Sequence, residues 1–132
     1  KSIGGKGPKA IYKKKHYTLI DRSHFSVIIE GMRRVVHEPG VTGKRAKLKD
    51  IIVCGKTGTV QNPHGEDHST FVAFAPMYKP KIAIAVFIEN AKGGGGLWAA
   101  PTAGLMIEKY LTKKIKIIYI NNYISISYKC KL

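Results

Sequence analysis

The sequence predicts an α+β fold in which an antiparallel three-strand meander is flanked by two helices. Apolar residues follow a helical spacing before residue 40 and again after residue 97. Between these segments come three short apolar runs that are joined by turn-like links. At 132 residues the chain is at most one domain with a modest core, and it is also short enough to be less than one domain.

The first predicted helix follows an N-terminal stretch, residues 1–22, which shows no periodicity and is expected to be extended or looped. Ser23 or Asp21 is available as the N-cap, and Pro39-Gly40 is expected to end the helix. The apolar residues that repeat at helical spacing are Phe25, Ile28, Ile29, Met32, Val35 and Val36.

Three strand-like runs follow, at about residues 51–61, 69–76 and 81–89. The links "NPHGED" and "MYKP" are typical of hairpin turns, so the runs are expected to form an antiparallel meander. The third run has isoleucine and valine on one face and alanine and phenylalanine on the other, so that neither face is polar. Such a strand is predicted to be central and covered on both faces.

The second predicted helix spans residues 98–111, after a run of four glycines, and Pro101 is tolerable in its first turn. After Leu111 the composition changes abruptly to lysine, isoleucine, tyrosine, asparagine and serine. Residues 1–112 are therefore predicted to be the domain portion and residues 113–132 a low-complexity basic tail, disordered or translated out of frame. A β-hairpin around Asn121-Asn122 is the other interpretation of the tail.

The charge balance is strongly basic, with 23 basic and 8 acidic residues and a net charge of +15. Such a charge raises nucleic acid, anionic membrane or an acidic polymer as partners, but the lysines cluster in the tail and near the N-terminus, which favours solvated basic loops. Cys54 and Cys130 are too few to indicate a disulfide framework, and Cys54 is predicted to be a small core residue. No apolar run reaches about 18 residues, so nothing in this sequence by itself targets or spans a membrane.

The stretch "IIVCGKTGTVQ", residues 51–61, has two chemical interpretations. Gly55-Lys56-Thr57 could end a phosphate-binding P-loop, but that loop needs a glycine where Asp50 stands, and the following residues continue a strand. Nucleotide binding is therefore disfavoured.

The second interpretation is a Lys-Thr-Gly strand at Lys56, Thr57 and Gly58. Its ammonium and hydroxyls can hold a carboxylate by charge-assisted hydrogen bonds worth about 1.5–3 kcal/mol each. A free N–H at the strand edge can serve as an oxyanion-hole donor, typically worth about 2.7–4 kcal/mol. Taken alone this three-residue match is weak, and an ordinary buried strand with one exposed lysine would explain it.

The wider context strengthens the second interpretation. The segments "EGMRRVV", "CGKTGT", "QNPHG", "DHS" and "FVAFAP" occur in this order, followed by Glu-Asn, a glycine run and Ala-Ala-Pro. Together they resemble the end of the transpeptidase domain of bacterial class B penicillin-binding proteins, and most closely the penicillin-binding protein 2 group of cell elongation. The resemblance covers about residues 1–112 and excludes the tail.

The resemblance implies the serine β-lactamase and penicillin-binding transpeptidase fold, and the activity of a peptidoglycan D,D-transpeptidase that binds penicillin. Lys56 would be the motif lysine, and the hydroxyls of Thr57 and Thr59 would hold the carboxylate of the substrate. Gly58 would let the substrate lie against the backbone, and the N–H of Thr59 would be an oxyanion-hole donor. The resemblance thus implies catalytic roles for Lys56 and Thr59, substrate contacts for all four residues, and no metal or cofactor.

The resemblance also implies partners and a location. The partners would be peptidoglycan stem peptides, β-lactams, the N-terminal part of the same domain and a membrane glycosyltransferase of the elongation machinery, without nucleic acid. The location would be the bacterial cytoplasmic membrane, with the catalytic domain on its outer, periplasmic face.

Two motifs of the family are missing from this sequence. The nucleophile lies in Ser-x-x-Lys and a second serine in Ser-x-Asn, and both precede Lys-Thr-Gly. None of the six serines fits either pattern; they are Ser2, Ser23, Ser26, Ser69, Ser125 and Ser127. The chain is therefore predicted to be the C-terminal part of the domain and inactive alone. The alternatives are a free-standing basic module that binds a polyanion, or a non-functional truncated product.

Other candidate sites are weaker. His64 and His68 flank two acidic residues in "HGEDH", but Pro63 and Gly65 predict a turn there rather than a helix that would orient two imidazoles toward a metal. The four-glycine run could cradle a phosphate, but a connection from strand to helix explains it better.

Overall fold

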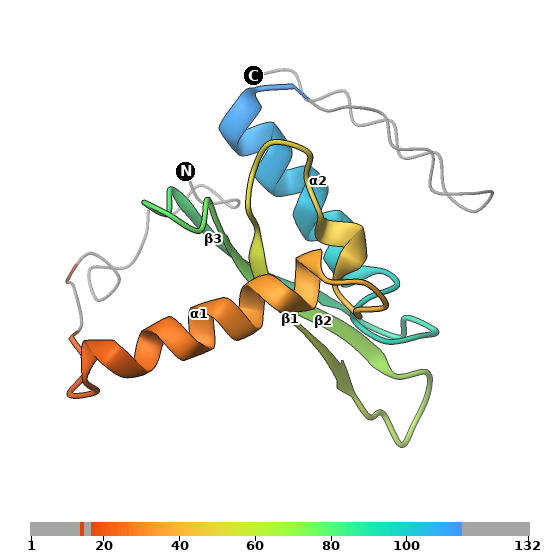
Figure 1. Cartoon of the computed structure of the whole chain (residues 1–132). Helices are drawn as coiled ribbons and strands as arrows, with labels where there is room; N and C mark the ends of the chain where they lie inside the picture. Colours follow the sequence, from red (N-terminus) through yellow and green to blue (C-terminus); the bar gives the residue numbers. More distant parts are fainter. Residues whose placement is uncertain (1–13, 15–16, 115–132) are drawn as a thin grey trace.

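The computed structural model describes residue 14 and residues 17–114. The expectations for most of the N-terminal stretch and for the tail beyond residue 114 lie outside the described residues. The elements, in chain order, are α1 (Arg22–His37), the 3-10 helix η2 (Lys44–Ala46), β1 (Cys54–Val60), β2 (His68–Ala75), β3 (Ile82–Ile88) and α2 (Ala99–Thr112) (Figure 1). The predicted α+β order of helix, three strands and helix is confirmed.

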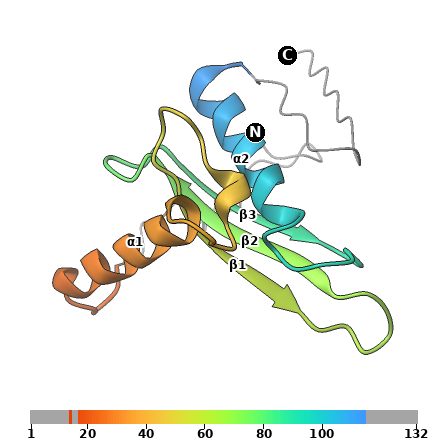
Figure 2. The same ribbon diagram turned by 45° about the vertical axis from the view of Figure 1, so that its right-hand side comes forward.

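Helix α1 starts at the predicted cap. Asp21 Oδ1 accepts hydrogen bonds from the N–H of Ser23 at 2.8 Å and from its hydroxyl at 2.7 Å, which satisfies one of the unpaired donors of the first turn. The helix ends at His37, just before Pro39-Gly40, and Gly40 has a φ of 70°, which favours glycine. Figures 1 and 2 both show the first turns of α1 extending away from the sheet, and Phe25 and Ile28 there are exposed.

The sheet has the order β1-β2-β3 and is antiparallel throughout. Both links between strands are short hairpin connections, as predicted. The prediction that the third strand is central and covered on both faces is wrong. Within the described sheet β2 is central and β3 lies at an edge, with Phe87 55% exposed.

The core lies between one face of the sheet and α2 (Figure 2). Small residues in α2 allow η2 to approach it closely; a Cβ on Gly104, in the middle of α2, would lie 3.1 Å from Ala46 Cα in η2. The buried residues of β2 and α2 in this core are Phe71, Ala73, Ala75, Ala99, Ala100, Ala103 and Ile107. The half-buried residues of β3 that pack against them are Ile82, Ile84, Val86 and Ile88.

The opposite face of the sheet is covered only in part. Cys54, which the register places on this face opposite Phe74, is fully buried as predicted, and burial raises the pKa of its thiol. Val60, Val72 and Phe87 share this face and are 45%, 48% and 55% exposed. Neither helix in the described part of the chain is long and apolar enough to cross a membrane.

Candidate functional site

The candidate site is built on β1, which pairs with β2 on one side and forms an edge of the described sheet (Figure 1). Side chains alternate between the two faces of a strand, so Lys56 and Gly58 lie on one face of β1 and Thr57 and Thr59 on the other. Thr59 pairs with Ser69, which identifies the face of the two threonines as the core face. Lys56 and the two threonine hydroxyls therefore do not point from one face. They can meet a common ligand only around the free edge of β1.

The free edge of β1 carries unpaired backbone groups as well. Lys56 Nζ donates to the carbonyl oxygen of Thr57 at 2.7 Å, so this carbonyl is accessible from the edge. In an antiparallel strand, residues two apart direct their N–H and C=O groups to the same side. The N–H of Thr59 therefore also faces away from β2. The free edge thus carries the Lys56 ammonium and a backbone donor, while the side chains of Thr57 and Thr59 belong to the core face of the same strand.

The hydroxyl of Thr57 has a partner that sequence reasoning missed. Thr42 Oγ1 lies 2.9 Å from Thr57 Oγ1, in the loop that follows α1. That loop is anchored on the helix, because the N–H of Gly43 donates to the carbonyl of Val35 at 2.9 Å. No sequence signal marked Thr42, because the contact joins two segments whose approach depends on the path of the chain.

The glycine run at residues 93–96 connects β3 to α2, as predicted, and it also lies against the candidate strand. A Cβ on Gly95 would collide with the carbonyl oxygen of Thr70 and would lie 2.7 Å from that of Gly58. A Cβ on Gly94 would lie 2.8 Å from Thr59 Oγ1. Only glycine permits this close packing of the segment on β1 and β2.

The loop between α1 and β1 gives the surroundings of the site a positive charge. It carries Lys44, Arg45, Lys47 and Lys49, all exposed, and the same loop contains Thr42. Arg45 Nη1 donates to the carbonyl of Leu97 at 3.1 Å, which ties the loop to the segment just before α2. An anionic ligand at the edge of β1 would therefore approach a basic surface.

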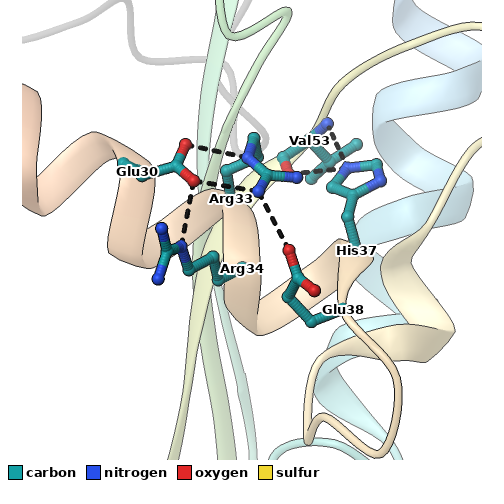
Figure 3. A network of polar contacts seen from close by, with 6 residues as sticks. All are labelled: Glu30, Arg33, Arg34, His37, Glu38 and Val53. Atoms are coloured by element: carbon teal, nitrogen blue, oxygen red, sulfur yellow. Dashed lines mark hydrogen bonds and ion pairs between the residues drawn. The ribbon is translucent and has the colours of Figure 1, made fainter.

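A network of charged side chains joins residues of α1 to one another and to its C-cap, Glu38 (Figure 3). Glu30 accepts from Arg33 Nε at 2.8 Å and Nη2 at 2.9 Å, and from Arg34 Nε at 3.0 Å. Arg33 Nη2 also donates to Glu38 at 3.0 Å. These hydrogen bonds, those from Arg33 first, lower the pKa of Glu30 to about 2.

His37, at the end of α1, contacts the residue that precedes β1. Its Nε2 lies 3.2 Å from both the N–H nitrogen and the carbonyl oxygen of Val53, so the ring tautomer decides which of them it bonds (Figure 3). Burial lowers the pKa of His37, against the opposing effect of the Val53 hydrogen bond. The end of α1 thus fixes where β1 begins.

The histidines of "HGEDH" make local contacts, His64 within the turn after β1 and His68 with the end of β3. His68 Nδ1 accepts from the N–H of Asn90 at 3.0 Å, and its ring lies 5.2 Å from that of Phe87. Asn62 Oδ1 accepts from the N–H of His64 at 3.1 Å, as expected in a turn. In residues 14 and 17–114, no group of three His, Cys, Asp or Glu side chains gathers where it could hold a metal ion.

Comparison with known proteins gives a consistent result. The family model of the penicillin binding protein transpeptidase domain matches residues 5–108. The peptidoglycan D,D-transpeptidase MrdA of Haemophilus influenzae is 36% identical over an alignment of 101 residues, and the match covers 64% of this chain. The crystal structure of Pseudomonas aeruginosa PBP2 in complex with WCK 5153 matches 80% of this chain with a TM-score of 0.64 and 32% identity.

A third similar protein is the penicillin-binding protein PBP2 of Helicobacter pylori, whose structure was solved in complex with MreC. It matches 67% of this chain with 27% identity and a TM-score of 0.56. The chain spans only a small part of these relatives: 15% of the length of MrdA, 23% of the Pseudomonas chain and 17% of the Helicobacter chain.

Proposed function

Because the chain belongs to the penicillin-binding protein transpeptidase family, we propose that it supplies one wall of a peptidoglycan D,D-transpeptidase active site. The observation that supports the proposal is the free edge of β1, where Lys56 Nζ donates to the carbonyl of Thr57 and the strand pairing directs the N–H of Thr59 away from β2. This wall receives the terminal carboxylate of a D-alanyl-D-alanine stem peptide, or the carboxylate of a β-lactam.

Each residue of this wall has a chemical role in the proposal. The Lys56 ammonium and the hydroxyls of Thr57 and Thr59 hold the carboxylate by charge-assisted hydrogen bonds. Gly58, which has no side chain, lets the peptide lie along the strand. The N–H of Thr59 donates to the oxygen on which negative charge develops when the penultimate carbonyl is attacked.

The attacking group comes from outside this chain in the proposal. A serine hydroxyl of a Ser-x-x-Lys segment adds to the penultimate carbonyl, loses its proton to a neighbouring base, and displaces the terminal D-alanine as an amine. None of the six serines of this sequence lies in that motif. The remaining part of the transpeptidase domain therefore supplies the nucleophile.

The partners and the location follow from the same proposal. The assembled enzyme would lie at the bacterial cytoplasmic membrane with its catalytic domain on the outer face. There it would act beside a membrane glycosyltransferase of the elongation machinery. The Helicobacter PBP2 complex with MreC supports an assembly partner for this family, and pull-down of the assembled enzyme from membranes would test it.

The proposal can be tested by grafting residues 17–112 into Haemophilus MrdA in place of the matching segment. We expect the chimera to form a covalent adduct with a fluorescent penicillin, because MrdA supplies the serine motifs. Replacing Lys56→Ala in the chimera is expected to slow acylation by about a hundredfold or more, the scale for removing a preorganised charged contact. Lys81→Ala, an exposed lysine far from β1 in the sheet order, is the matched control.

The outcomes separate the proposal from its alternatives. The 132-residue chain alone is expected to form no adduct, and a stoichiometric adduct would show that it contains a nucleophile after all. A folded chimera that is acylated equally well with and without Lys56 would overturn the assigned wall. Strong, salt-dependent binding of a polyanion by the chain alone would instead favour the basic binding module.

A further inference from the structure

Ser69 is a polar side chain in the core, directly opposite Thr59 in the pairing of β1 and β2. It is fully buried, and its neighbours on the same face of β2 are apolar. A buried hydroxyl is costly unless it is hydrogen-bonded, so its partners indicate why it is there.

The hydroxyl of Ser69 joins two segments. It donates to the carbonyl of Gly94 at 3.2 Å and accepts from the N–H of Ala99 at 3.1 Å. Ala99 is the first residue of α2, and Trp98 at the N-cap supplies no side-chain hydrogen bond. Ser69, on β2, therefore supplies the acceptor for the first N–H of α2, which no residue of the helix start provides. The same hydroxyl also holds Gly94 of the glycine run.

This placement reaches the candidate site. The carbonyl of Gly94 also accepts from the N–H of Leu97 at 2.9 Å, so two hydrogen bonds hold this one carbonyl oxygen. Gly94 lies beside the Thr59 hydroxyl. A Cβ at this position would lie 2.8 Å from Thr59 Oγ1, so even a methyl group would crowd the hydroxyl. The position of Gly94 thus determines how much space the Thr59 hydroxyl has on that side.

We propose that Ser69 is a positioning residue for the site: it holds the glycine segment 93–96 against β1, and Gly94 in that segment sets the rotamer of Thr59. The inference rests on the proposed function, in which the Thr59 hydroxyl binds a carboxylate. Ser69 itself touches no substrate and acts through Gly94. The ligands that the Thr59 hydroxyl would bind are substrates with a terminal carboxylate, both D-alanyl-D-alanine peptides and β-lactams.

The first test measures the χ1 rotamer of Thr59 in the full 132-residue chain without a ligand. Three-bond couplings to the Thr59 Cγ2 methyl, measured by NMR on labelled protein, report its χ1 rotamer. We expect one dominant rotamer in the unchanged chain, rotamer averaging in Ser69→Ala, and a changed rotamer in Gly94→Ala. Ser26→Ala and Gly31→Ala, both in exposed positions of α1, are the matched controls and should leave the couplings unchanged.

The second test measures binding of diacetyl-lysyl-D-alanyl-D-alanine from the amide shift of Thr59. Ser69→Ala is expected to weaken binding by about threefold to tenfold, the effect of misplacing one ordinary hydrogen bond. In a Thr59→Val background the same change should have no further effect, because Ser69 acts only through the Thr59 hydroxyl. A purely structural role would instead weaken binding equally in both backgrounds.

The outcomes keep the two proposals apart. Unchanged Thr59 couplings in both Ser69→Ala and Gly94→Ala would overturn the positioning role, whatever the ligand does. If Ser69→Ala does not fold, Gly94→Ala decides alone, since it leaves the buried hydroxyl in place. Changed couplings without any peptide binding by the unchanged chain would support positioning of Thr59 and count against the carboxylate site.

Discussion

Single glycines decide how closely the chain packs around the candidate strand. Gly95 lies against the backbone of both β1 and β2, where a side chain would meet backbone oxygens that cannot move cheaply. Gly31, by contrast, lies on the exposed side of α1 with no heavy atom within 4 Å of a Cβ. The same residue type therefore has opposite importance at the two positions.

A pair of alanine substitutions tests this difference. We expect Gly95→Ala to lower the free energy of unfolding by about 1–3 kcal/mol or more, because the added methyl overpacks the sheet. Gly31→Ala should raise it by about 0.5–1 kcal/mol, since alanine favours a helix interior. Urea unfolding of both variants beside the unchanged chain gives the two values. Equal effects of the same sign would contradict the packing seen around Gly95.

His37 couples stability to pH. Its pKa is lowered in the folded chain chiefly by burial, so the folded state takes up a proton less readily than the unfolded state, whose histidines titrate near about 6.5. The stabilising effect of neutral His37 is complete above that pH and is lost as the pH falls through the lower folded value. We expect His37→Gln to flatten this part of the stability curve. His64→Gln, in the exposed turn, is the control, and parallel curves for both variants would refute the role of His37.

At the scale of elements, α1 and the loop behind it determine where β1 lies. The charged network orders the last two turns of the helix, His37 reaches the residue before the strand, and Thr42 reaches Thr57 within it. The first two turns of α1 make no comparable contact and are exposed. The second half of α1 is therefore held by polar contacts, whereas the first half is exposed to solvent.

The network in α1 can be tested through Glu30. Arg33→Gln removes the first cause of the lowered pKa of Glu30, so that pKa should rise from about 2 toward the ordinary value of about 4.3. The contribution of Glu30 to stability is present above its ordinary pKa and is lost as the pH falls through about 2. Carbon-detected NMR titration of the Glu30 carboxyl measures both values. Arg22→Gln, at the exposed start of α1, is the control and should leave the titration unchanged.

At the scale of the whole molecule, the two faces of the sheet have opposite surroundings. One face forms the core with α2, whereas the other leaves Val60, Val72 and Phe87 about half exposed. Exposed apolar side chains on a sheet face promote association. The chain also spans only 15% of MrdA, so an intact relative has far more chain with which to cover such a face.

We expect the isolated chain to self-associate through this exposed face. The double change Val72→Thr and Phe87→Thr should shift sedimentation toward the monomer with little loss of stability, because both side chains are exposed. Val86→Thr places the same chemical change on the core face of β3 and should instead lower the free energy of unfolding, by about 1–3 kcal/mol. An unchanged chain that sediments as a monomer at high concentration would contradict the expectation.

The sequence by itself determined the order of the elements, the two hairpins and the strand that carries Lys56-Thr57-Gly58, and it narrowed the cap of the first helix to Asp21 or Ser23. These features depend on local periodicity, turn residues and motif spacing, which residues near one another in the chain supply. Only the tertiary structure decided that β3 lies at an edge, because an apolar pattern indicates burial but does not specify which strand lies beside it. It also decided that Lys56 lies on one face of β1 and the two threonines on the other. The contacts of Thr42 with Thr57 and of Ser69 with Gly94 also came only from the tertiary structure, since contacts between distant segments depend on how helices and strands pack and not on any local pattern.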